Sequence, residues 1–169
     1  QVIRERLEMK SYLTAGLRVV YKDEKAKVRH EFKHEGGIED MLKQQIEHEK
    51  VGTVHPDALR FTTDDADGEG TQIDCVIQWT ESTNETIHCF ANGIPTVDGG
   101  THANGLRDGV AAAIMSYLEA HDAVPRGVEI KRSDIREGVV GVVNVFLADP
   151  QFQGQTKDRL TTPSVARHV

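Results

Sequence analysis

Hydrophobic residues recur along the chain with two different periods, and the change of period separates predicted helices from predicted strands. Helical spacing, with apolar residues three or four positions apart, marks three segments. It predicts helices over residues 3–13, 38–48 and 101–121. Alternation with a period of two is typical of half-buried strands. It predicts strands over residues 59–62, 73–79 and 87–91. Two further strands are predicted on either side of a turn at residues 23–25, over residues 17–21 and, with mostly polar residues, 28–34.

The three predicted strands between residues 59 and 91 are separated by short polar turns, which indicates an antiparallel meander. Cys75 and Cys89 flank the turn at residues 81–84 almost symmetrically, so we expect them to be cross-strand neighbours. Both are expected to be reduced and buried, because an unpaired cysteine packs like a small hydrophobic residue. A regulatory disulfide between them is the alternative.

A different kind of strand is predicted at residues 139–147, where the sequence is almost continuously apolar. Such a run is typical of a strand that is buried on both faces. A short helical turn is expected before it, at residues 133–138. After it, a polar loop covers residues 151–161. Thr162-Pro163 then favours the start of another helix, because proline is well tolerated at the first helical position.

The composition suits one folded domain. The chain has 169 residues, 38% of them hydrophobic and 28% charged, and this length can bury a core without disulfides. The net charge of −7 argues against a domain whose main task is to grip nucleic acid, since phosphate contacts need clustered Lys and Arg. There is no membrane-spanning apolar run and no signal peptide, and two cysteines suit a reducing cytoplasm. The chain opens with Gln1 rather than Met, which suggests a fragment.

Two patterns resemble metal sites. His30-Glu31-Phe32-Lys33-His34 matches the HExxH pattern of zinc peptidases, and a metallohydrolase using His30 and His34 is one hypothesis. The pattern works on a helix, whereas residues four apart on the predicted strand lie roughly 13 Å apart, so a solvated strand face is favoured. The run from residue 65 to 70 resembles the start of a calcium loop but lacks the final bidentate Glu, which favours a polar hairpin turn.

The loop at residues 149–157 is the strongest candidate for chemistry. It lies between the buried strand and the start of the next helix, and it carries Gln155 and Lys157. An ammonium and an amide on an exposed loop could bind an anion such as a phosphate. The alternative is an ordinary solvated lysine on a surface loop.

The same loop carries a resemblance to a known family. Its sequence, Asp149-Pro150-Gln151-Phe152 followed by Gly154-Gln155-Thr156-Lys157, is similar to the segment that holds the Gln-Thr-Lys motif of the B subunits of bacterial type IIA DNA topoisomerases, gyrase and topoisomerase IV. Further similar motifs occur in the family's order. They are Glu35-Gly36-Gly37-Ile38, Ile94-Pro95-Thr96, Gly99-Gly100-Thr101-His102, Gly105-Leu106-Arg107 and Ile135-Arg136-Glu137-Gly138. Together they do not separate gyrase from topoisomerase IV.

This resemblance implies a fold and a domain organisation. The fold would be α+β, a mixed sheet backed by helices, of the ribosomal protein S-five domain-two-like class with a left-handed βαβ crossover. Such handedness is rare. Residues 1–169 would form a single transducer domain. Within it, residues 1–13 would be a leading helix, residues 14–161 the α/β core, and residues 162–169 the start of a truncated helix.

The resemblance also implies a mechanism. Lys157 matches the lysine that contacts the γ-phosphate of ATP, and Gln155 its companion. Arg107 matches an arginine that lines the cavity for the transported DNA segment. ATP and Mg²⁺ would be held mainly by an N-terminal GHKL ATPase domain outside this chain, so that no metal site and no activity are expected in the fragment alone. Expected partners are that domain, the topoisomerase A subunit and, transiently, double-stranded DNA, but no membrane. A non-catalytic binding module of the same fold is the alternative.

Overall fold

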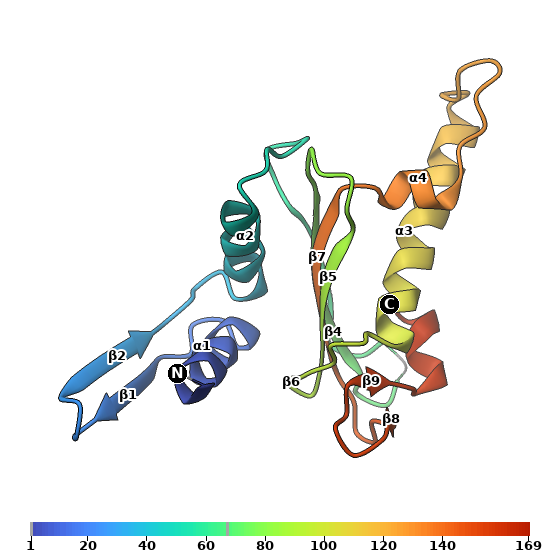
Figure 1. Ribbon diagram of the computed structural model, residues 1–169. Helices are drawn as coiled ribbons and strands as arrows, with labels where there is room; N and C mark the ends of the chain where they lie inside the picture. Colours follow the sequence, from blue (N-terminus) through green and yellow to red (C-terminus); the bar gives the residue numbers. More distant parts are fainter. Residues whose placement is uncertain (1, 67) are drawn as a thin grey trace. The chain divides into compact units, whose positions relative to one another are not determined.

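The computed structural model of the chain describes residues 2–66 and 68–169. They form two compact units, Gln1–Lys50 and Val51–Val169. The first unit contains helix α1 (Val2–Leu13), strands β1 (Val19–Asp23) and β2 (Val28–Phe32), and helix α2 (Ile38–Glu49) (Figure 1). Strands β1 and β2 pair antiparallel in a two-stranded ribbon. The two predicted helices of this region are confirmed, and the two strands are confirmed with their bounds shifted by up to two residues.

The second unit is built on a five-stranded sheet with the order β3-β4-β7-β5-β6. Its strands are β3 (Leu59–Thr63), β4 (Gln72–Trp79), β5 (Thr86–Ala91), β6 (Ile94–Pro95) and β7 (Val139–Phe146). Strand β7 runs antiparallel to β4 and parallel to β5, so the sheet is mixed. The seven residues from Val139 to Val145 are all buried, which confirms the strand predicted from their continuous apolar run.

The predicted meander is wrong for its third strand. Strands β3 and β4 do pair antiparallel, but β7 separates β4 from β5. The expectation that Cys75 and Cys89 are cross-strand neighbours is wrong for the same reason, because both residues are in register with Val143, one on each side of it. The physical cause is burial: the most apolar strand of the sheet occupies the middle, where both of its faces leave water.

Helix α3 (Thr101–Ala120) runs along one face of this sheet (Figure 1) and, with the short helix α4 (Arg132–Arg136), connects β5 to its parallel neighbour β7. The core between helix and sheet is apolar. It includes Ile73, Cys75 and Ile77 of β4, Val143 and Val145 of β7, Leu106 of α3, and Leu160 and Val165 near the end of the chain. The expected α+β fold, a mixed sheet backed by helices, is confirmed. No helix in the described residues is long and apolar enough to cross a membrane.

The segment after β7 contains more regular secondary structure than the sequence predicted. Within the expected loop, β8 (Phe152–Gln153) pairs antiparallel with β9 (Arg159–Leu160). A 3-10 helix, η1 (Pro163–Arg167), follows and packs against α3. Proline does occupy its first turn as predicted, and Thr162 lies at the N-cap position, but the Thr162 side chain makes no capping hydrogen bond. Its hydroxyl oxygen instead accepts a hydrogen bond of 2.9 Å from the Gln151 backbone N–H.

Candidate functional site

The β8–β9 hairpin presents Gln155 and Lys157 to solvent. Both side chains are exposed, and both lie in the connection between the two strands. Lys157 has a backbone φ of 61°, in the left-handed region that residues other than glycine rarely adopt. Such a conformation persists only where the surrounding structure holds the backbone in place.

The base of the hairpin is fixed although its tip is exposed. Leu160 is fully buried in the core, and Phe152, its partner in the β8–β9 pair, packs against the same core. The Thr161 N–H donates a hydrogen bond of 2.8 Å to the Gln151 carbonyl, which closes the segment around the hairpin. The tip therefore extends from a rigid support, as a binding group needs if it is to reach a ligand in a defined geometry.

The Lys157 ammonium rests on an aromatic ring. Its nitrogen lies 5.4 Å from the centroid of the Phe152 ring. At an exposed site such a cation–π contact stabilises by about 0.5–1 kcal/mol, which is small enough for the ammonium to leave the ring when a stronger anionic partner arrives. The side chain is thus held loosely and outside the interior of the domain.

A turn before α3 supports the hairpin from the side. Its backbone is hydrogen-bonded to the hairpin between Asp98 and Asp158 and between Gly99 and Leu160. His102, three residues after Gly99, is completely buried at the start of α3, and its Nε2 lies 3.1 Å from the Thr96 hydroxyl oxygen. Burial, assisted by the positive charge of Arg107, lowers the pKa of His102 to about 4, so the ring is neutral at pH 7.

Sequence reasoning did not single out His102 as a titrating group. Its sequence signal was only the motif Gly99-Gly100-Thr101-His102, which carried the resemblance but no chemistry. Nothing in the hydrophobic pattern distinguishes a buried histidine from a solvated one, because the helix in which it lies has polar residues on several sides.

Arg107 is ion-paired within the second unit. Its Nε donates to a carboxylate oxygen of Glu85, which precedes β5, and the other oxygen of that carboxylate lies 3.4 Å from Nη1 of Arg136 in α4. All three side chains are partly buried. Two guanidinium groups thus share one carboxylate. In the described part of the chain, Arg107 makes no hydrogen bond or ion pair with Gln155 or Lys157.

The two histidines of the HExxH pattern are not arranged as metal ligands. His30 lies in β2, flanked by Tyr21 and Phe32. His34 stacks on Tyr12 at a centroid distance of 3.6 Å, and its Nδ1 lies 2.8 Å from the Ser11 hydroxyl. Across residues 2–66 and 68–169, no group of three His, Cys, Asp or Glu side chains could hold a metal ion.

The calcium-like run falls partly outside the described residues, because residue 67 belongs to it. In its described part, the Asp65 carboxylate accepts a hydrogen bond of 2.8 Å from the Gly70 N–H. This contact closes a turn between β3 and β4, as the favoured interpretation predicted.

Both cysteines are free and buried, as expected for reduced residues. Burial raises the pKa of Cys75 to about 12 and that of Cys89 to about 11. Both thiols therefore stay protonated at neutral pH, and neither is a candidate nucleophile, since the thiolate is the reactive form.

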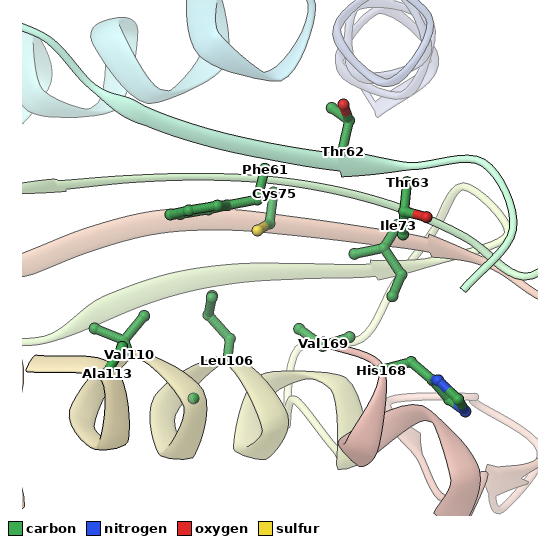
Figure 2. A pocket seen from close by; sticks show the side chains of 11 residues that line it. Phe61, Thr62, Thr63, Ile73, Cys75, Leu106, Val110, Ala113, His168 and Val169 are labelled. Carbon is green, nitrogen blue, oxygen red and sulfur yellow. The ribbon is translucent and has the colours of Figure 1, made fainter. Parts of the chain in front are cut away.

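An apolar cavity of about 310 Å³ lies between α3 and the β3–β4 edge of the sheet, and sequence reasoning missed it. Figure 2 shows Phe61, Cys75 and Ile73 from the strands facing Leu106 and Val110 from α3. His168 and Val169 also line it. The cavity contains few polar groups and so offers no chemistry of its own.

Comparison with known proteins gives a family. The family model for DNA gyrase B matches residues 37–169. The DNA gyrase B subunit of Myxococcus xanthus is 33% identical over 98% of this chain and 20% of its own length. The DNA topoisomerase 4 B subunit of Salmonella typhimurium strain LT2 is 32% identical over 96% of this chain and 25% of its own length. The chain thus spans about a fifth to a quarter of the curated relatives it matches.

The fold is similar to solved structures of the same group. The crystal structure of the 43K ATPase domain of Thermus thermophilus gyrase B, in complex with an aminocoumarin, superposes with a TM-score of 0.85 at 28% identity, covering 98% of this chain and 43% of that one. The topoisomerase IV ATP-binding domain of Francisella tularensis, with a TM-score of 0.76, is also 28% identical, covering 98% of this chain and 43% of that one. The chain therefore belongs to the DNA gyrase B family and corresponds to a segment of a type IIA topoisomerase B subunit.

Proposed function

We propose that this chain is the transducer domain of an ATP-dependent type II DNA topoisomerase, and that Lys157 delivers its ammonium to the γ-phosphate of ATP held by an ATPase domain of the same subunit. Gln155 contributes its amide to the same phosphate. The domain couples hydrolysis of the nucleotide to the passage of one DNA segment through another. The observation that carries the proposal is the exposure of both side chains at the tip of an anchored hairpin.

The residues at the tip fit a phosphate and do not fit a metal. The Lys157 ammonium offers three hydrogen-bond donors and the Gln155 amide two, and both side chains are exposed. No cluster of carboxylates or histidines that could hold Mg²⁺ exists among the described residues. We therefore propose that the ATPase domain holds Mg²⁺ and makes most of the nucleotide contacts.

The chemical role of Lys157 is electrostatic. Negative charge spreads over the oxygens of the phosphoryl group as it is transferred, and a positioned cation stabilises that charge. A lysine suits this task because its ammonium is a compact point charge on a flexible stem. Two solved structures similar to this one are described as an ATPase domain and as an ATP-binding domain, which supports a nucleotide as the anion.

The contact also offers a switch. Once the γ-phosphate has left, the ammonium loses its anionic partner and can return to the Phe152 ring. Segments held by γ-phosphate contacts are released on hydrolysis in other nucleotide-driven proteins. In this chain the hairpin is hydrogen-bonded to the turn before α3, so its release can change the position of that helix.

For Arg107 we propose a place at the wall of the cavity that encloses DNA. Glu85 neutralises one of the two guanidinium groups that share it, which leaves one positive charge between Arg107 and Arg136. A single excess charge suits transient enclosure of DNA rather than tight binding, in keeping with the net charge of −7.

We further propose that both units belong to one transducer domain, because the solved relatives match 98% of the chain.

The test is the Lys157→Ala variant of the full-length subunit, assayed for ATP hydrolysis. We expect the rate to fall more than about a hundredfold, equivalent to about 3 kcal/mol of transition-state stabilisation. Lys25→Ala is the control, because Lys25 is also exposed but lies in the turn between β1 and β2. An unchanged rate in the Lys157 variant would refute the proposed role and favour a non-catalytic binding module.

A further inference from the structure

We infer that the turn at residues 98–100 is the positioning element for Lys157: it holds the base of the hairpin against the start of α3 and so determines where the ammonium can reach. This inference rests on the proposed function of Lys157. It goes beyond that proposal, in which the turn only passes the release of the hairpin on to α3, and the experiment below separates the two.

The turn and the hairpin are joined by backbone hydrogen bonds. The Asp98 N–H donates to the Asp158 carbonyl at 2.9 Å, and the Leu160 N–H donates to the Gly99 carbonyl at 3.0 Å. Gly100 and Leu160 also form an isolated parallel bridge. Asp158 is the residue next to Lys157 in the chain, so the connection ends one residue from the group that it positions.

Gly100 is the tightest point of this connection. A Cβ atom built on it would lie 2.2 Å from the carbonyl oxygen and 2.6 Å from the nitrogen of Leu160. Its φ of 137° is also unfavourable for any other residue. Leu160 cannot yield easily, because its own side chain is fully buried in the core. A side chain at position 100 therefore has to push the second strand of the hairpin away from the turn.

The same turn begins α3, whose first residue is Thr101. Five residues along the helix, a Cβ atom on Gly105 would lie 2.8 Å from the Ala166 carbonyl oxygen, so η1 is pressed against α3 as well. The segment after β7 thus makes two close approaches, to the turn at Gly100 and to α3 at Gly105, and only the first includes the hairpin. This difference supplies a matched control.

The experiment compares Gly100→Ala, Lys157→Ala and the double variant in the full-length protein, through kcat and KM for ATP hydrolysis. We expect Gly100→Ala to lower kcat by about tenfold to a hundredfold, because displacement of a positioned group by about 1 Å has effects of that order. KM should change little, since another domain holds most of the nucleotide. In the Lys157→Ala background, the added Gly100→Ala change should have less than about a threefold effect, because its action passes through the missing ammonium.

Gly105→Ala is the control for a general loss of structure. It crowds the same helix and the same C-terminal segment without touching the hairpin, so we expect a lower thermal midpoint with kcat unchanged. If Gly100→Ala does not fold, Arg159→Ala replaces it. This variant removes one exposed hydrogen bond, from the Arg159 guanidinium to the Asp98 carbonyl at 3.3 Å, and kcat should fall by about twofold to fivefold.

The outcomes separate the two proposals. If Lys157→Ala is slow while Gly100→Ala and Arg159→Ala are normal, the positioning role is wrong and the function of Lys157 stands. Equal losses from Gly100→Ala in the two backgrounds would also overturn the positioning role, because they would place its effect elsewhere. A normal rate in Lys157→Ala refutes the proposed function itself.

Discussion

Strand β7 and the β8–β9 hairpin follow one another in the chain, yet they differ in almost every physical respect. Seven of the eight residues of β7 are buried, and it pairs with a strand on each side. The hairpin has two strands of two residues each, and its tip is exposed. Stability and chemistry are thus divided: β7 supplies the apolar area on which folding depends, while the tip of the hairpin supplies exposed donors that can bind a ligand.

The largest expected effect comes from placing a charge in β7. Val143→Asp should prevent the second unit from folding, because Val143 is fully buried. An unpaired carboxylate at this position costs more free energy than the roughly 5–15 kcal/mol by which a typical domain is stable. Circular dichroism and thermal melting check this. Val97→Asp is the control, since 76% of Val97 is exposed, and it should melt normally. A cooperative melt of the Val143 variant would show that the centre of the sheet is less critical than its burial indicates.

An intermediate effect is expected at the start of α3, where His102 is buried next to the turn that supports the hairpin. Its pKa is lowered from about 6.5 to about 4, so between these pH values the unfolded chain binds a proton that the folded chain does not. Stability should therefore be complete above about pH 6.5 and fall as the pH is lowered, with a loss of about 3 kcal/mol by pH 4. Chemical denaturation across this range measures it. In His102→Gln the part of the slope between pH 6.5 and pH 5 should disappear; a slope that persists there would assign the titration to other groups.

The smallest effect is expected within the hairpin. Phe152→Leu keeps an apolar side chain in place but removes the ring beneath the Lys157 ammonium. Stability should change by less than about 1 kcal/mol, because an exposed cation–π contact contributes no more than that. Equilibrium denaturation of the isolated chain gives the value. A loss of several kcal/mol would mean that the Phe152 ring contributes far more packing than a partly buried side chain should, and that the contrast with β7 is overstated.

Sequence reasoning succeeded where the signal was local. The helical spacing that predicted α1, α2 and α3 and the apolar run that predicted β7 depend only on neighbouring residues. The order of strands could not be found in this way, since the sequence does not say that β7 lies between β4 and β5. Cys75 and Cys89 were wrongly expected to be cross-strand neighbours because the order of the strands was not known. The hairpin was missed because its strands are too short to show a period.

The candidate site was accessible only in part. Physical reasoning on the sequence found an exposed ammonium and amide, but it could not distinguish them from any polar loop; the ordered motifs supplied the rest. The ion pairing of Arg107 by Glu85 was not predictable, because the two residues are 22 positions apart and meet only once the strand order is known. The same holds for the closeness of Gly100 to Leu160, which depends on the path of the chain after β7.

The separation of the two cysteines by β7 has a practical consequence. Adjacent strands are about 4.8 Å apart, so the two thiols are about twice that distance from each other across the sheet, beyond the reach of a disulfide. Oxidants cannot link them while the sheet is intact. Because Cys89 is also buried, outside the lining of the cavity beside α3, and protonated, an alkylating reagent reaches it only when the sheet opens. Cys89 is thus a natural reporter of that opening, and its labelling rate would follow it without any introduced probe.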